Sequence, residues 1–232
     1  MRSLIVGHGE IGKSLENVLL KEYPVKWVDA KTASDAVAVD WTDILHVCFP
    51  YSDTFVKDVK EYQESLRPLY TVIHSTVPVG TSRQLNATHS PVIGIHPHLE
   101  RSLTTFTKFL SGEKASDVAD YFRRAGMKVY LFDAPETTEL LKPMDTTFYG
   151  LCVEFTKEIK RKCEEFGIPF EAWTIYNQAY NDGYERLGYL EYRRPNLVPI
   201  QKRLGGHCVL QNTHLVSSPF ADLIQKLNEQ AG

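Results

Sequence analysis

One stretch near the N terminus decides the fold of this chain: Arg2-Ser3-Leu4-Ile5-Val6-Gly7-His8-Gly9-Glu10-Ile11-Gly12-Lys13. The apolar run Leu4 to Val6 predicts a short buried strand, and the amphipathic pattern from Glu10 to Glu22 predicts a helix. Between them, three glycines have the spacing G-x-G-x-x-G. A strand, a tight turn and a helix therefore follow one another at the start of the chain.

Each glycine of this turn has a physical role. Gly7 permits the sharp turn, Gly9 lets a ligand approach the backbone closely, and Gly12 lets the helix lie against the strand. The exposed N–H groups and the positive dipole end of the helix suit phosphate groups. We therefore expect the pyrophosphate of a dinucleotide to be bound by Gly7, His8, Gly9, Glu10, Ile11 and Gly12.

The second predicted strand, Val25 to Val28, ends in Asp29. An acidic residue about 20 positions after the glycines can accept hydrogen bonds from a ribose, whereas it repels a 2'-phosphate. The predicted cofactor is therefore NAD, although Lys31 weakens this preference. The alternative is an ordinary strand-to-helix turn with a surface aspartate.

The composition restricts the class of protein and the kinds of partner that we expect. The 232 residues are 43% hydrophobic and 24% charged, as in ordinary globular proteins, and suffice for one large or two small domains. A net charge of −3 gives no reason to expect nucleic acid or an anionic membrane as a partner. We expect no membrane anchor or signal peptide and no metal site. Four cysteines without metal-ligand spacing favour a reducing, cytoplasmic setting.

The order of the predicted elements indicates an α/β fold. Strands at Ile44 to Phe49, Thr71 to His74, Pro91 to Ile95 and Lys128 to Phe132 alternate with helices at 53–66 and 108–122. Residues 30–43 leave room only for a trimmed connection with a short strand. This alternation predicts a Rossmann-type, doubly wound parallel sheet over residues 1–134, the NAD-binding domain.

The pattern changes after residue 134. A long helical pattern from Pro135 to Gly167 contains Pro143, a second helix is predicted over 171–183, and a third over 219–230. Residues 188–206 are rich in Tyr, Arg, Pro and Gly and predict an irregular segment. We expect residues 135–232 to form a smaller, all-helical domain.

Polar residues follow several predicted strands, where ligands bind in open α/β sheets. Pro50 follows one strand, Ser75 and Thr76 follow the next, and His98 lies beyond the strand that ends at Ile95. The hydroxyls of Ser75 and Thr76 could contact a nicotinamide or a substrate. A well-capped loop explains the same residues without a ligand.

Two further residues are candidates for chemistry. Cys208 follows Gly205 and Gly206, and a thiolate is a strong nucleophile when its pKa is lowered, although most lone cysteines only fill the core. Lys142, in Glu139-x-x-Lys142, could act as a base or stabilise an oxyanion, or it could be an ordinary surface lysine.

Together these stretches resemble the UDP-glucose/GDP-mannose (nucleotide-sugar) 6-dehydrogenases, in the 6-phosphogluconate-dehydrogenase-like superfamily. The matches follow the family's order: the glycine turn, Asp29, Ser75 to Gly80, Glu139-x-x-Lys142 and Gly205 to Cys208. The resemblance covers the family's N-terminal portion and central helices. It therefore implies a form without the C-terminal nucleotide-sugar domain.

The resemblance implies an activity and its residues. In the family, NAD oxidises a sugar C6 alcohol to a carboxylate in two hydride transfers, and members commonly dimerise through the long central helix. By position, Cys208 would form the covalent thioester, Lys142 would stabilise oxyanions, and Thr76 would order a water or the substrate. A homodimer and a small-molecule, sugar-like or hydroxy-acid substrate are implied.

Three positions depart from the family pattern. Thr146 replaces an asparagine, Asn212 replaces an aspartate, and His98 replaces the glutamate of a Pro-Glu-Phe-Leu motif, with Glu100 as an alternative carboxylate. Pro143 requires the helix to start or kink beside Lys142. Three hypotheses follow: a two-step dehydrogenase, a single-step β-hydroxyacid-type dehydrogenase using Lys142, and an NAD-binding protein with a degenerate site.

Overall fold

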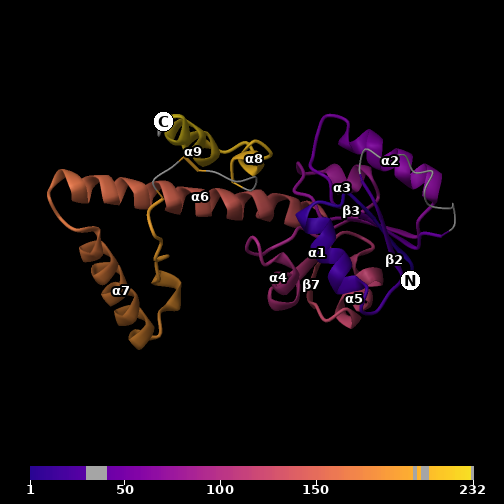
Figure 1. Ribbon diagram of the computed structural model, residues 1–232, viewed down its shortest axis with the longest axis horizontal. Helices are drawn as coiled ribbons and strands as arrows, with labels where there is room; N and C mark the ends of the chain where they lie inside the picture. The colour runs from indigo at the N-terminus through magenta and orange to yellow at the C-terminus, as the bar shows by residue number, and fades with distance from the viewer. Residues whose placement is uncertain (30–40, 201–202, 205–208, 231–232) are drawn as a thin grey trace. The chain divides into compact units, whose positions relative to one another are not determined.

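The computed structural model describes residues 1–29, 41–200, 203–204 and 209–230. The chain divides into two compact units, Met1–Lys142 and Pro143–Gly232 (Figure 1). The first unit is α/β and the second is helical in its described residues. The domain boundary predicted after residue 134 precedes this division by a few residues.

The first unit is built on a seven-stranded sheet in the order β2-β1-β3-β4-β5-β6-β7. Neighbouring strands run parallel, except that β5 pairs antiparallel with β6 through His89 and Ser111. β2 and β3 lie on opposite sides of β1, so the strand order changes direction there. The strands are β1 (Ser3–Val6), β2 (Val25–Val28), β3 (Ile44–Val47), β4 (Tyr70–Ile73), β5 (Thr88–His89), β6 (Thr107–Ser111) and β7 (Lys128–Phe132).

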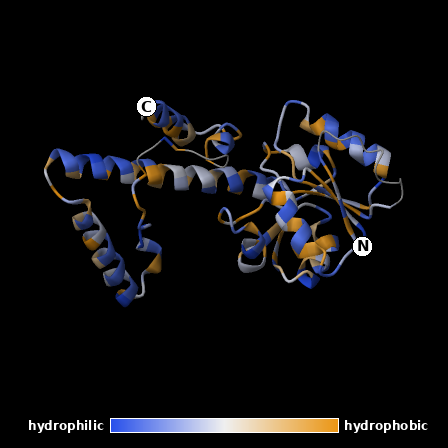
Figure 2. Ribbon diagram, viewed as in Figure 1, coloured by the Kyte–Doolittle hydropathy of each residue, from blue (hydrophilic) through white to orange (hydrophobic). Residues whose placement is uncertain are grey.

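Helices cover both faces of this sheet. Successive residues of β1 belong to different apolar clusters, because Ile5 packs in one cluster while Leu4 and Val6 pack in the other. Residues of α1 and α5 join the cluster of Ile5, and residues of α2 join the other. Figure 2 shows the colour of hydrophobic residues along the strands between these helices. The helices are α1 (Glu10–Leu19), α2 (Phe55–Leu66), α3 (Thr81–Gln84), α4 (Leu99–Thr105) and α5 (Ala115–Arg124).

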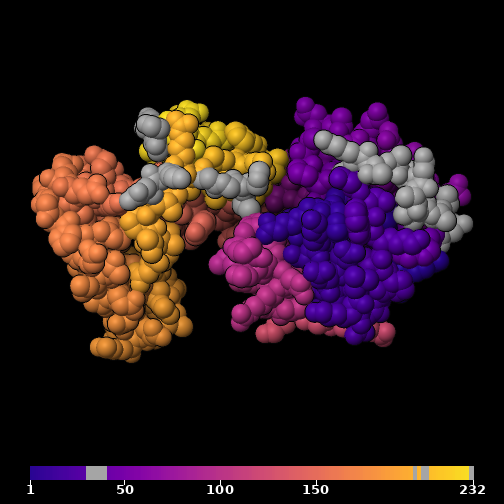
Figure 3. Space-filling model, in the orientation of Figure 1, coloured from indigo at the N-terminus to yellow at the C-terminus, as the bar shows by residue number. Residues whose placement is uncertain are grey.

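The second unit has a small core of its own. A Cβ atom at Gly150 of α6 would lie 2.8 Å from Val209 and 3.1 Å from Ile224, which shows how closely α8 and α9 approach α6 (Figures 1 and 3). Val153 and Leu204 complete this cluster. The elements are α6 (Glu136–Glu165), which begins in the first unit, α7 (Phe170–Leu187), the 3₁₀ turn η2 (Leu190–Tyr192), α8 (Val209–Thr213) and α9 (Pro219–Gln230). No helix of the described residues is long and apolar enough to span a membrane.

The predicted fold class, a Rossmann-type sheet followed by a smaller helical part, is confirmed. Two predicted elements are wrong. Residues 91–95 form no strand, because β5 is already paired on both sides by β4 and β6. The pattern over 108–122 joins the end of strand β6 to helix α5, and Gly112, with φ of 128°, separates them. The sheet is also not wholly parallel, as the β5–β6 pair shows.

Pro143 lies inside α6 and does not start it, because the helix begins at Glu136. The short strand predicted within residues 30–43 falls mostly outside the described residues.

Candidate functional site

The glycine turn joins β1 to α1 with no room for side chains at two positions. A Cβ at Gly12 would lie 2.1 Å from the Gly7 carbonyl oxygen, and a Cβ at Gly7, whose φ is 92°, would lie 2.7 Å from the Phe49 nitrogen. A Cβ at Gly9, by contrast, would have no atom of the described residues within 4 Å. Gly7 and Gly12 therefore serve packing, while Gly9 leaves open space at the N-cap of α1.

That open space suits the phosphates of a dinucleotide. α1 has ten residues, and its first backbone N–H groups point beyond the N-cap with the positive end of the helix dipole. Gly9 is the N-cap residue directly before these groups, so a ligand meets no side chain of that residue there. The residues present therefore fit a bound pyrophosphate.

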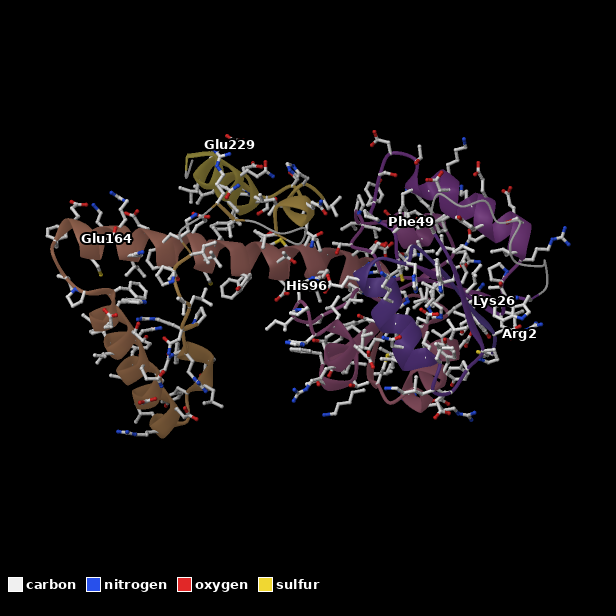
Figure 4. The ribbon with its side chains drawn as sticks, viewed as in Figure 1. Arg2, Lys26, Phe49, His96, Glu164 and Glu229 are labelled. Atoms are coloured by element: carbon white, nitrogen blue, oxygen red, sulfur yellow. The ribbon has the colours of Figure 1, made fainter. Side chains whose placement is uncertain are left out.

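The side chains of the turn contact the protein. The His8 ring stacks on Trp27 of β2, with 3.8 Å between the ring centroids and 3° between the planes. His8 Nε2 also lies 2.6 Å from Glu16 Oε2 on α1. Glu10, in the first turn of α1, pairs at 2.5 Å with Nδ1 of His96, which is labelled in Figure 4. Any contact of His8 and Glu10 with a cofactor would therefore use their backbone.

Asp29 follows β2 directly and is exposed. β2 lies beside β1, so Asp29 lies at the same edge of the sheet as the glycine turn. This is the position in which a carboxylate can reach a ribose.

The loop after β4 is held by hydrogen bonds. The Ser75 hydroxyl donates to the Phe49 carbonyl oxygen at 2.5 Å, and His89 Nε2 lies 3.1 Å from the Ser75 carbonyl oxygen. Ser75 is thus buried, and its hydroxyl is engaged in a hydrogen bond within the protein. Thr76 beside it is half-buried. Pro50 is exposed at the end of the neighbouring strand.

Glu139 is a structural anchor to which the sequence analysis gave no role. Its carboxylate accepts hydrogen bonds from the backbone nitrogens of Gly80 at 2.6 Å and Ser82 at 2.7 Å. The side chain is buried, and this burial raises the pKa of Glu139 against the opposing effect of the two hydrogen bonds. Lys142, one helical turn further along, is half-buried. The signal in the sequence was an acidic residue in the first turn of a helix.

His98 and Glu100, the two candidate residues near the start of α4, have different surroundings. His98 is the exposed N-cap of α4, and its carbonyl accepts a hydrogen bond from Ser102 at 2.8 Å. Glu100 contacts α1, because Asn17 donates to it at 3.0 Å and Lys21 lies 3.7 Å from it. Glu100 is therefore engaged in joining α4 to α1.

The remaining predicted residues belong to the second unit. Thr146 is buried on α6, and Asn212 is half-buried on α8. Cys208, Gly205 and Gly206 lie outside the described residues. The convergence of Lys142 with Cys208 therefore stays a prediction. Among the described side chains, no group of three His, Cys, Asp or Glu residues could hold a metal ion.

Fold and glycine turn together define a dinucleotide-binding type of α/β unit followed by helices. No family model matches the chain. The curated UDP-N-acetyl-D-mannosamine dehydrogenase of Methanocaldococcus jannaschii is 24% identical over 174 residues, which cover 68% of this chain. Those residues cover 37% of that enzyme, so the match spans little more than a third of the relative.

Solved structures show the same fold. UDP-D-ManNAc dehydrogenase from Pyrococcus horikoshii matches with a TM-score of 0.80 and 14% identity, covering all of this chain and 69% of that one. The 3-hydroxyisobutyrate dehydrogenase of Mycobacterium tuberculosis matches with a TM-score of 0.74 and 14% identity, covering 99% of this chain and 93% of that one. The chain thus resembles nucleotide-sugar dehydrogenases in sequence and shares its fold with them and with hydroxyacid dehydrogenases.

Proposed function

We propose that this protein is an NAD-dependent oxidoreductase that oxidises an alcohol of a sugar-like or nucleotide-sugar substrate. The observation that carries the proposal is the glycine turn, where Gly7 and Gly12 are closely packed and Gly9 faces open space. Asp29 at the same sheet edge favours NAD over NADP, because its carboxylate would repel a 2'-phosphate. The likeness to sugar dehydrogenases supports the substrate class.

Lys142 and Cys208 would each have a separate role in the reaction. NAD, when bound, supplies the hydride acceptor. Lys142 would take up the hydroxyl proton or, when charged, stabilise the oxyanion that forms. The Cys208 thiolate would add to the aldehyde carbon, and the adduct would hold the aldehyde through a second oxidation to the thioester, for which a second NAD would be the hydride acceptor.

Water would then hydrolyse the thioester and restore the thiol. Thr76, half-buried beside Ser75, would order this water, and His98 would accept its proton. Asn212 cannot act as a carboxylate base, so its side chain would serve as a hydrogen-bond partner only.

A single-step oxidation that uses Lys142 without Cys208 is the second candidate. The hydroxyisobutyrate dehydrogenase favours it, because this chain matches 93% of that enzyme's length. An NAD-binding protein with a degenerate site is the third reading, which the replacements at Asn212 and Thr146 support.

We also propose a cytoplasmic homodimer. Cys48, Cys152 and Cys163 are unpaired thiols, which suits a reducing compartment. The second unit exposes several large apolar side chains, which a second copy would cover: Phe148, Phe155, Phe166, Ile175 and Leu187.

Reduction of NAD by candidate sugar alcohols, nucleotide sugars and hydroxy acids tests the proposal. The intact protein should reduce NAD with at least one of them. Cys208→Ser should abolish the two-step reaction and spare a single-step one, whereas Lys142→Met should abolish both. NAD binding without turnover on any of these substrates would favour the degenerate reading.

A further inference from the structure

A continuous chain of buried polar side chains crosses the core of the first unit. Ser3 Oγ lies 2.7 Å from the Tyr121 hydroxyl, which lies 3.1 Å from His46 Nε2, and His46 Nδ1 lies 3.0 Å from His74 Nε2. These four side chains come from β1, α5, β3 and the end of β4, and none is more than 5% exposed. Buried polar groups of this kind are usually hydrogen-bonded in one defined arrangement.

Lys108 of β6 lies at the end of this chain. Its Nζ is 3.3 Å from His74 Nδ1 and 5.0 Å from the centroid of the Phe122 ring. The residue is 4% exposed, and no carboxylate of the described residues forms an ion pair with it. A buried ammonium without a counter-ion is strongly unfavourable.

The titratable groups that interact with Lys108 come from β3, β4 and β5 or directly follow these strands: His46, Cys48, His74 and His89. Burial lowers the pKa of Lys108 to about 7, against the opposing effect of Cys48. Burial, reinforced by the charge of Lys108, lowers the pKa of His46 to about 3 and that of His74 well below its ordinary value. The histidines therefore stay neutral near neutral pH, and each has one donor and one acceptor nitrogen.

The Ser90 carbonyl oxygen determines the direction of the chain. It lies 3.1 Å from His74 Nδ1, and a carbonyl only accepts, so His74 carries its proton on Nδ1. His74 Nε2 must then accept from His46 Nδ1, and His46 Nε2 must accept from the Tyr121 hydroxyl. In this arrangement the Nδ1–H group of His74 points toward both the Ser90 carbonyl oxygen and Lys108 Nζ. Because an ammonium has only donors, Lys108 cannot be charged while it faces this N–H group.

We propose that Lys108 is an uncharged amine in this arrangement and that its protonation reverses the direction of the whole chain from His74 to Ser3. One proton enters from solvent and remains on Lys108. The ammonium then donates to His74 Nδ1, His74 Nε2–H donates to His46 Nδ1, and His46 Nε2–H donates to Tyr121. Tyr121 in turn donates to Ser3, and every group except Lys108 keeps its number of protons.

The reversal reaches the start of the loop that follows β4 and carries Ser75 and Thr76. His74 precedes Ser75, and the Ser90 carbonyl loses its imidazole donor in the reversed arrangement. The Ser90 hydroxyl is also buried and has no hydrogen-bond partner among the described residues. The first unit therefore contains a proton-responsive element that links β6 to the loop after β4.

The imidazole tautomers test this directly. In the intact protein, the nitrogen shifts of His46 and His74 should indicate Nδ1–H tautomers at about pH 9 and Nε2–H tautomers at about pH 6, in step with the titration of the Lys108 side chain. Lys108→Met should fix both histidines in the Nδ1–H form at all these pH values. Lys60→Met, at an exposed position of α2, should leave the transition unchanged.

Nδ1–H tautomers that persist in the intact protein while Lys108 gains its proton would overturn the proposal. So would a Lys108 ammonium that stays charged at about pH 9. If Lys108→Met does not fold, the titration of the intact protein tests the proposal by itself. NAD binding does not enter this test, so its result is independent of the proposed function.

Discussion

The carboxylate of Glu139 accepts a hydrogen bond of 2.6 Å from the backbone nitrogen of Gly80. Gly80 has φ of 96°, in the left-handed region, so the chain turns sharply at this contact. The bond ties the first turns of α6 to the loop after β4. Lys142 and Thr76, which the sequence placed in one site, are thereby carried by two segments that are joined directly.

Replacing Glu139 with Gln should destabilise the first unit. The amide keeps one acceptor oxygen but places an NH₂ group against a buried backbone N–H, which costs about 1–3 kcal/mol. Denaturant unfolding measures the loss. Glu136→Gln, which alters the exposed pair with Arg83, is the matched control and should change stability much less. Equal losses for the two variants would contradict the role assigned to Glu139.

The glycine turn gives two substitutions with opposite expectations. Gly12→Ala should destabilise the protein, because its Cβ would lie 2.1 Å from the rigid Gly7 carbonyl oxygen. Gly9→Ala should leave the melting temperature nearly unchanged, because no atom in the described part of the chain lies within 4 Å of its Cβ, yet it should weaken dinucleotide binding. Calorimetric melting and NAD titration separate the two effects. Unchanged NAD affinity in Gly9→Ala would show that the dinucleotide phosphates do not bind beside Gly9.

The sequence predicted the sheet and turn well because local patterns encode them. The buried run at Leu4 to Val6 and the spacing of Gly7, Gly9 and Gly12 are short-range features, and their packing in the structure follows directly. Residues 108–122 were misread because Leu110 of β6 lies eight residues before Val118 of α5, a separation that also suits one face of a helix.

The polar core could not be predicted in this way. His46, His74 and Lys108 are far apart in sequence and meet only because β3, β4 and β6 belong to one sheet. Glu139 likewise shows its role only through backbone groups about 60 residues away. Long-range partners of this kind leave no local periodicity to read.

Acid should unfold the first unit steeply. Burial lowers the pKa of His46 to about 3 and that of His89 to about 4, and lowers that of His74 well below the ordinary value of 6.5. The unfolded chain therefore binds more protons below about pH 6.5, and the free energy of unfolding falls as the pH drops toward the folded values. Three protons give a limiting slope of about 4 kcal/mol per pH unit.

Denaturant unfolding over a series of pH values measures that slope. His89→Gln should reduce it by about one proton's contribution, because this variant removes one buried imidazole. A pH-independent stability between about pH 4 and pH 6 would show that the three histidines are not buried as neutral groups.

The exposed apolar residues of the second unit should mediate self-association. Phe155 on α6 is 64% exposed, and its replacement by Asp should shift the protein from dimer to monomer in light scattering after gel filtration. Leu69→Asp, at a residue 63% exposed in the first unit, is the control and should leave the dimer intact. A monomeric intact protein at micromolar concentration would refute the homodimer.

Calorimetric titration of the intact protein with NAD and with NADP tests the central claim most directly. NAD should bind at one site per chain and more tightly than NADP, and Asp29→Asn should narrow the difference between them. Equal affinity for both cofactors would show that Asp29 does not select NAD over NADP. Absence of binding by either would contradict the account of this protein as a dinucleotide-dependent dehydrogenase.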